Sequence, residues 1–228
     1  MKTFRYLLVL VFVGFSFSCQ KDTGLTNEQI VAGLKEALKV GATNSTTQAH
    51  ATDGYFLNSL IKIPWPQDAE FVKVAVSAIP IIGQPLVDEL VLKVNRAAED
   101  AADKALPIFV DAITNINFSD ALGILNGADD AATQYLKTNT SAGLKTAFKP
   151  NIQTSLTSVG AQQAWNNVTS TYNSTIPSPQ PINTDLADYT TGKAIDGLFV
   201  LVAKEEYKIR TDINARVSDI LKQVFGNK

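Results

Sequence analysis

Hydrophobic residues recur along most of the chain at the three- and four-residue spacing of an amphipathic helix. The first such run follows Thr26, which with Gln29 has the sequence of a capping box, and it extends over residues 30–38. We expect this helix to end at Gly41, because residues 43–48 are rich in Thr, Ser and Asn.

The next two helices are separated by proline and glycine. The pattern predicts a helix over residues 67–79, a break at residues 80–83, and a long apolar stripe that begins after Pro85. The second half of that stripe is rich in alanine, which indicates close contact with a neighbouring helix. Pro107 is expected to bend or restart this helix, and residues 108–115 continue the apolar pattern.

The second half of the chain is also predicted to be helical. We expect a short helix that Ser119 caps and that ends at Gly127, and a later proline-rich loop over residues 176–183. The other predicted helices cover 128–138 with Asp129 and Asp130 in its first turn, a segment from Ser141 that is interrupted near Pro150 and ends at Gly160, and 161–173, 189–211 and 213–225.

No run of residues alternates cleanly enough between polar and apolar positions to predict a sheet. We therefore expect an all-α fold, a single compact multi-helix domain of about eight to ten helices over residues 26–228. The segment Ile61–Pro66 is expected to be extended, because residues before proline avoid the helical region.

The N-terminus has the pattern of a secretory signal peptide over residues 1–18: a basic start, a short apolar run and a small residue, Ser18, before Cys19. It resembles a bacterial lipoprotein signal, in which the thiol of the new N-terminal residue takes up lipid. We expect Cys19 to be lipidated and residues 19–25 to form a short polar linker. Gln20 follows the cysteine where an aspartate would favour retention in the inner membrane. The expected location is the outer membrane, at its periplasmic face or the cell surface. A plain signal peptide with an incidental cysteine is the alternative.

Charge and composition exclude several classes of protein. Removal of Lys2 and Arg5 with the signal leaves 18 basic and 22 acidic residues, a formal charge of −4, which offers no electrostatic surface for nucleic acid. Cys19 is the only cysteine and His50 the only histidine. We therefore expect no metal site and no cofactor, since a zinc site needs three or four protein ligands. The chain also lacks the motifs of a nucleophile elbow, a phosphate-binding loop and a dinucleotide-binding turn.

Two groups of residues are candidates for a functional site. Tyr55, Phe56 and Trp65 cluster in an irregular segment, which either covers the core or presents an apolar patch to a partner. The second candidate consists of Arg96, Glu99 and Asp103, which share one helical face. They either form a functional charge network or belong to a solvated face with local ion pairs.

Several stretches together resemble a bacterial family of unknown function, DUF4197, over about residues 26–226. The stretches are 30–38 (IVAGLKEAL), 95–99 (NRAAE), 107–113 (PIFVDAI), 127–135 (GADDAATQY) and 190–199 (TTGKAIDGLF). The resemblance implies an all-helical exported protein, and it does not imply any particular reaction.

Three functions remain open at this stage. The first is a membrane-anchored envelope lipoprotein that is not an enzyme and that binds another protein or organises the envelope. The second is a helical carrier that binds an apolar small molecule or lipid between its helices. The third is a carboxylate-dependent enzyme, since the 22 acidic residues would allow a catalytic pair that the sequence does not single out.

Overall fold

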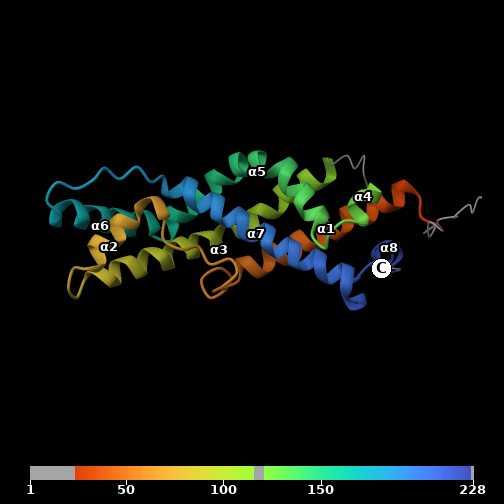
Figure 1. The fold of residues 1–228 in the computed structure, drawn as a ribbon, viewed down its shortest axis with the longest axis horizontal. Helices are drawn as coiled ribbons and strands as arrows, with labels where there is room; N and C mark the ends of the chain where they lie inside the picture. The colour runs from red at the N-terminus through yellow and green to blue at the C-terminus, as the bar shows by residue number, and fades with distance from the viewer. Residues whose placement is uncertain (1–23, 116–120, 227–228) are drawn as a thin grey trace, which may run out of the picture.

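The computed structural model describes residues 24–115 and 121–226, and within them every regular element is a helix and no strand occurs (Figure 1). The predicted fold class is confirmed. The described elements are α1 (Asn27–His50), the 3₁₀ helix η1 (Gln67–Ala69), α2 (Glu70–Ser77), α3 (Gly83–Asn115), α4 (Ala121–Leu125), α5 (Ala131–Ser158), α6 (Ala161–Thr175), α7 (Leu186–Thr211), the 3₁₀ helix η2 (Ile213–Ala215) and α8 (Asp219–Phe225).

Four long helices form the centre of the molecule. Helices α1 and α5 both pack against α3 and α7, so that the four surround a common core. The 33-residue α3 is about 50 Å long and extends beyond this bundle. At one end of the molecule α2 and α6 pack against the first half of α3, and at the other end α8 and α4 pack against α1 (Figure 1). The domain is therefore elongated, and α1 begins at the α4–α8 end.

Two aromatic pairs join segments that are far apart in the sequence. The rings of Phe109 on α3 and Phe199 on α7 meet edge to face with centroids 5.4 Å apart. Trp65, which precedes η1, and Trp165 on α6 have ring centroids 5.9 Å apart. Such pairs contribute about 0.5–1.5 kcal/mol beyond the area they bury, so both ends of the bundle have a specific packing contact.

The prediction that the first helix ends at Gly41 is wrong, because α1 continues to His50. Gly41, Ser45 and Ala49 lie one turn apart and are all buried, so small residues form a face that neighbouring helices approach closely. Thr46 satisfies its hydroxyl by donating to the carbonyl of Ala42 at 2.8 Å. Tertiary packing thus overrides the weak helix propensity of this polar stretch.

The predicted breaks at Ser141 and Pro150 are also wrong, since α5 runs unbroken from Ala131 to Ser158. Ser141 donates to the carbonyl of Lys137 within the helix and does not cap a new one. Pro150 is exposed, so the carbonyl four residues before it can bond to water. Pro107 likewise lies inside α3 without ending it. Asp129 and Asp130 precede the helix and do not lie in its first turn, and the side chain of Asp130 makes no capping bond.

The last predicted helix, 213–225, is divided into η2 and α8. Arg216 lies between them, and its Nε and Nη2 donate to the carbonyls of Ile209 and Arg210, each at 2.9 Å. This bond to the end of α7 fixes the chain in a turn where a continuous helix was expected. The predicted signal peptide over 1–18, Cys19 and the predicted cap Ser119 lie outside the described residues.

Candidate functional site

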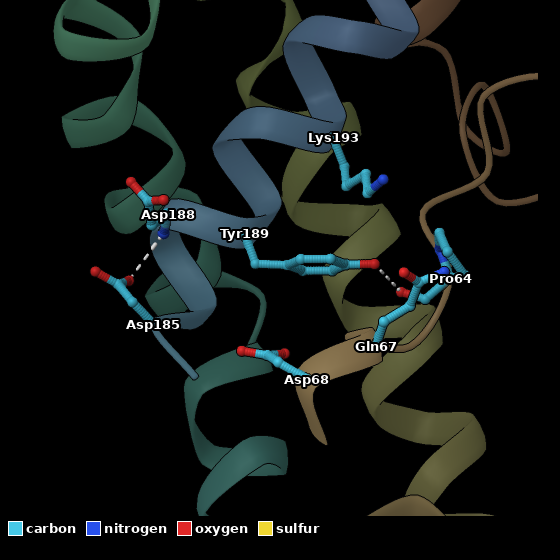
Figure 2. Close-up of a pocket in the computed structure, with 7 residues that line it drawn as sticks. All are labelled: Pro64, Gln67, Asp68, Asp185, Asp188, Tyr189 and Lys193. Carbon is cyan, nitrogen blue, oxygen red and sulfur yellow. Dashed lines mark hydrogen bonds between the residues drawn. The ribbon is translucent and has the colours of Figure 1, made fainter. Parts of the chain in front are cut away.

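A polar hollow of about 360 Å³ opens where the start of α7 faces the segment before α2 (Figure 2). Its volume is at the lower end of the range for small-molecule sites. Both charge signs occur in its lining, which consists of Pro64, Gln67, Asp68, Asp185, Asp188, Tyr189 and Lys193.

Tyr189 crosses this hollow and ties its two sides together. Its hydroxyl donates to the carbonyl of Pro64 at 2.9 Å, as Figure 2 shows. Burial, with a smaller contribution from the nearby charge of Asp68, raises the pKa of Tyr189 to about 12. The phenol therefore keeps its proton at neutral pH and acts as a donor that holds residues 64–65 against α7.

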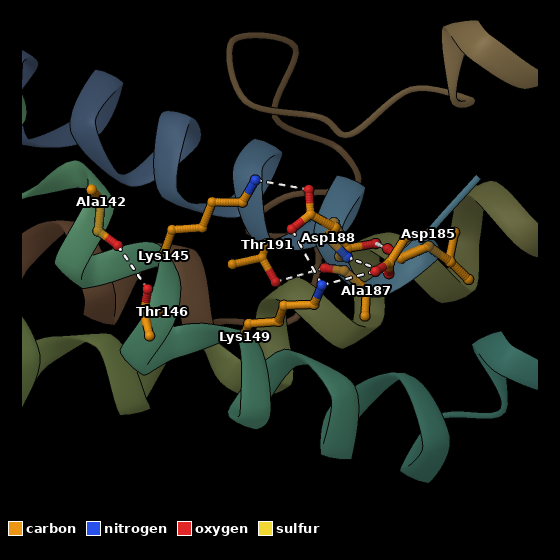
Figure 3. Close-up of polar contacts among 10 residues, drawn as sticks. Ala142, Lys145, Thr146, Lys149, Asp185, Ala187, Asp188 and Thr191 are labelled. Carbon is orange, nitrogen blue, oxygen red and sulfur yellow. Dashed lines mark hydrogen bonds and ion pairs between the residues drawn. The ribbon is translucent and has the colours of Figure 1, made fainter. Parts of the chain in front are cut away.

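A second hollow of about 430 Å³ adjoins the first and shares Asp188 with it. Here Lys145 and Lys149 of α5 reach across to α7 (Figure 3). Lys145 Nζ lies 2.7 Å from Asp188, and Lys149 Nζ lies 2.8 Å from Asp185 and 3.3 Å from Asp188. Asp185 also caps α7 by accepting from the amide of Asp188 at 2.8 Å. The two lysines and two aspartates thus join α5 to the start of α7.

The arrangement of these carboxylates suits ion pairing better than proton transfer. Hydrogen bonds from Lys149 and Lys145 hold the pKa of Asp185 and Asp188, respectively, below the usual range. A carboxyl group that acts as a general acid needs a raised pKa instead. The site can therefore fix two helices relative to each other, and its charged lining suits a polar ligand better than an apolar one.

The predicted charge network on α3 exists in part. Arg96 Nη1 lies 2.6 Å from Glu99 as its spacing predicted, and Arg96 Nη2 lies 2.7 Å from Asp53. Asp103 is not part of this cluster, because it is exposed and paired with Lys104 at 2.7 Å. The place expected for Asp103 is taken by Asp53, which approaches from the loop after α1.

Glu99 connects this network to the predicted aromatic segment. Its Oε1 accepts from the backbone amides of Tyr55 and Phe56 at 3.1 and 3.0 Å. Tyr55 and Trp65 are buried, whereas Phe56 is half-buried with Lys62 Nζ 4.2 Å from its ring centroid. Burial and the charge of Glu99 raise the pKa of Tyr55, whose hydroxyl donates to the carbonyl of Ala194. Two of the three aromatic residues thus belong to the core.

His50 contacts the same region. Its Nδ1 lies 2.8 Å from the backbone carbonyl of Glu99, so the Nδ1–H tautomer donates to that oxygen. Within residues 24–115 and 121–226, no three His, Cys, Asp or Glu side chains come together as ligands for a metal ion.

The sequence did not reveal a buried ion pair on α7. Glu206 and Arg210 are 2.7 Å apart, with only 2% and 5% of their side chains exposed. Glu206 accepts from the amides of Ala132 and Thr133 at the start of α5. Arg210 donates to the carbonyls of Leu125 and Ile124 at the end of α4. The pair therefore caps two helix ends at once, and only its i,i+4 spacing was visible in the sequence.

A third feature lies at the α2–α6 end of the molecule, where the chain turns from α2 into α3 (Figure 1). The turn and the last part of α2 expose large apolar side chains: in the turn Ile81 is 92% exposed and Ile82 53%, and on α2 Val74 is 64% exposed. Ile81 also has φ at +71°, and the amide of Ile82 donates to the carbonyl of Pro80 at 2.8 Å. This is the combination of a classic γ-turn, which is rare and strained, above all at a β-branched residue.

The same end of the molecule is free of charged side chains over two long stretches. None occurs in residues 74–87, which contain the turn, or in residues 150–184, which contain α6 and the loop after it. Because α6 packs against both α2 and α3, α6 lies beside residues 74–87 in space. We call residues 74–87 with α6 the uncharged end. It contains no charged residue, and Lys73 and Asp88 border it.

No helix in the described part of the chain combines the length and the hydropathy that crossing a membrane requires.

The family model described as a protein of unknown function, DUF4197, matches residues 24–226. No curated protein and no solved structure matches the chain.

Proposed function

The chain belongs to the DUF4197 family over residues 24–226, and on that premise we propose that it is a lipid-anchored envelope protein that works through protein contacts at its uncharged end. In this proposal it is not an enzyme. Cys19 carries the lipid at the outer membrane, and the helical bundle holds the opposite end away from the membrane surface.

The observation that carries the proposal is that the two ends of the molecule differ: α1 begins at one end, and the uncharged end lies at the other. α1 begins at the α4–α8 end, so a lipid at Cys19 would hold that end near the membrane (Figure 1). The uncharged end lies at the other extremity, with α3 alone accounting for about 50 Å of the separation. Exposed apolar side chains in a stretch without charged residues are typical of surfaces that contact a partner, because charges are depleted from the centre of interfaces. Here Lys73 and Asp88 border that stretch.

The two alternatives receive less support. The hollows beside Asp188 are lined by charged side chains, which suits an apolar ligand poorly. The carboxylates that converge there have a lowered pKa and lysine partners, which does not favour acid catalysis. A further hollow of about 500 Å³ beside α4 and α5 has no charged side chain in its lining, but polar and apolar side chains alternate there. The carrier therefore remains the better supported of the two alternatives, and the enzyme has no specific observation in its favour.

Anchoring is tested by the change Cys19→Ser. The variant is expected to leave the membrane fraction, because it lacks the thiol that takes up lipid. The apolar run before residue 19 is too short to span a bilayer in place of the lipid. Cell fractionation with detection of the chain measures this directly. Retention of the variant in the membrane fraction at the wild-type level would refute lipid anchoring.

Contact through the uncharged end is tested by chemical cross-linking in intact envelopes. The variant Ile81→Gly is expected to lose cross-linked species that the wild type forms. Ile213→Ser is the matched control, because Ile213 is also an exposed isoleucine, at 68%, but lies on η2 outside the uncharged end. Equal cross-linking in the wild type and Ile81→Gly would refute the proposed role of this surface.

A further inference from the structure

We infer that the hollow crossed by Tyr189 binds a short peptide with free termini, whose ammonium group pairs with Asp68 and whose carboxylate pairs with Lys193. The hollow is not part of the uncharged end, so the site stands or falls independently of the proposed function.

The lining of this hollow presents two charges that no neighbour neutralises. Two lysines of α5 pair with Asp185 and Asp188 from the side of the second hollow. Asp68 and Lys193 remain, and neither forms an ion pair or a side-chain hydrogen bond with the residues that the structure describes. The hollow therefore offers one free carboxylate and one free ammonium group, and a ligand with one charge of each sign is complementary to it.

The ring of Tyr189 keeps these two charges apart. Figure 2 shows Asp68 on one side of the ring and Lys193 on the other. The hydroxyl is fixed at the opposite wall, 2.9 Å from the carbonyl oxygen of Pro64 and 3.4 Å from that of Trp65. Burial is the larger cause of the raised pKa of Tyr189, and the charge of Asp68 adds to it, which places that carboxylate near the phenol. The two charges thus face one hollow without pairing, and a ligand that spans the ring can contact both.

The separation of the charges and the size of the hollow favour a short peptide. A free amino acid carries both charges on one carbon, so it cannot contact both sides of the ring at once. The termini of an extended dipeptide are about 7 Å apart. A hollow of about 360 Å³ limits the ligand to a few residues. The side-chain amide of Gln67, which makes no hydrogen bond to the described residues, can donate to and accept from a peptide group.

The affinity is expected to be modest. Asp68 and Lys193 are exposed, so water and salt screen their attraction for the ligand. For a ligand as small as a dipeptide we expect a Kd on the order of 10⁻⁴ M. The fixed position of Tyr189 favours binding, because the ring and the two walls need not be ordered when the ligand enters.

Isothermal titration calorimetry of the full chain in detergent solution tests the inference, with L-alanyl-L-alanine as the probe. We expect saturable binding of this dipeptide. Three related compounds should bind at least tenfold more weakly: the N-acetyl dipeptide, which lacks the ammonium group, the dipeptide amide, which lacks the carboxylate, and L-alanine. No binding of the dipeptide up to about 10 mM, or equal binding of a blocked form, would overturn the inference.

Two variants assign each terminus to its side chain. Asp68→Asn should bind the free and N-acetyl dipeptides equally, and Lys193→Gln should bind the free dipeptide and its amide equally. Asp129→Asn and Lys204→Gln are the matched controls, because both residues are exposed, lie outside the hollow and have no ion pair within the described residues. Thermal unfolding checks that each variant folds. If the variants at 68 and 193 kept the wild-type preferences, the binding would lie elsewhere and the inference would be wrong.

Phosphoethanolamine distinguishes a peptide from a lipid headgroup. It also carries an ammonium and an anionic group on a short chain, but it has no peptide group for Gln67 to contact. We expect it to bind at least tenfold more weakly than the dipeptide. Binding as tight as that of the dipeptide, or tighter, would assign the hollow to a headgroup and overturn the inference.

Discussion

Ile81 combines two properties that folding alone does not favour, a left-handed backbone conformation and an almost fully exposed apolar side chain. Left-handed conformations cost a residue with a Cβ atom about 1–2 kcal/mol, and a β-branched residue is among the least tolerant. Because the side chain buries so little area, its removal forfeits little hydrophobic stabilisation. The position is therefore one where stability and binding are expected to respond in opposite directions.

The change Ile81→Gly should stabilise the monomer by about 0.5–1 kcal/mol. Glycine removes the backbone strain, and the free energy gained in this way exceeds the cost of the greater conformational entropy of glycine in the unfolded chain. Urea unfolding at low protein concentration measures the effect. A variant that is less stable than the wild type would show that the turn is not strained at this residue.

Glu206 should be among the most sensitive positions in the core. Replacing it with glutamine leaves the guanidinium of Arg210 buried without its counter-charge, which costs about 3 kcal/mol. Asp219→Asn is the control, because Asp219 pairs with Lys222 at 3.5 Å on the surface, and we expect a loss below about 0.5 kcal/mol. Urea unfolding that gave similar losses for both variants would contradict this account of the buried pair.

At the scale of helices, sequence periodicity identified most elements but misplaced some of their ends. The end of α1 was predicted too early because Ser45 and Thr46 of its polar stretch are buried beside Gly41 and Ala49, which only tertiary contacts reveal. Pro150 was read as a break in α5, although an exposed proline costs less where water replaces the lost bond. Where a helix began at a capping box, as at Thr26, the sequence was sufficient.

Two glycines of α7 should respond to alanine in opposite directions. A Cβ atom on Gly197 would lie 2.9 Å from Tyr55 Cε1 and 3.1 Å from Ile61 Cβ, so Gly197→Ala should destabilise the fold by about 1–2 kcal/mol. A Cβ atom on Gly192 would meet no atom within 4 Å, so Gly192→Ala should stabilise it by about 0.5–1 kcal/mol. Thermal unfolding of both variants measures the difference, and a shift of the same sign for both would contradict the packing described for α7.

At the scale of the whole molecule, the sequence predicted the all-helical fold class and, within the candidate sites, one ion pair, that between Arg96 and Glu99. Arg96 and Glu99 are three residues apart on one helix, so their pairing followed from spacing. Asp53 joins them from 43 residues away, and nothing local indicates that approach. The uncharged end was equally hidden, because residues 74–87 and α6 are brought together only by the packing of α6 on α2 and α3.

The central claim is that the molecule is held at one end and makes its contacts at the other. Photo-cross-linking in living cells tests it most directly, with a photoreactive amino acid placed at position 82 in one variant and at position 213 in another. The account predicts a specific cross-linked species from position 82 and none from position 213. Cross-links from position 213 alone, or none from position 82, would contradict it.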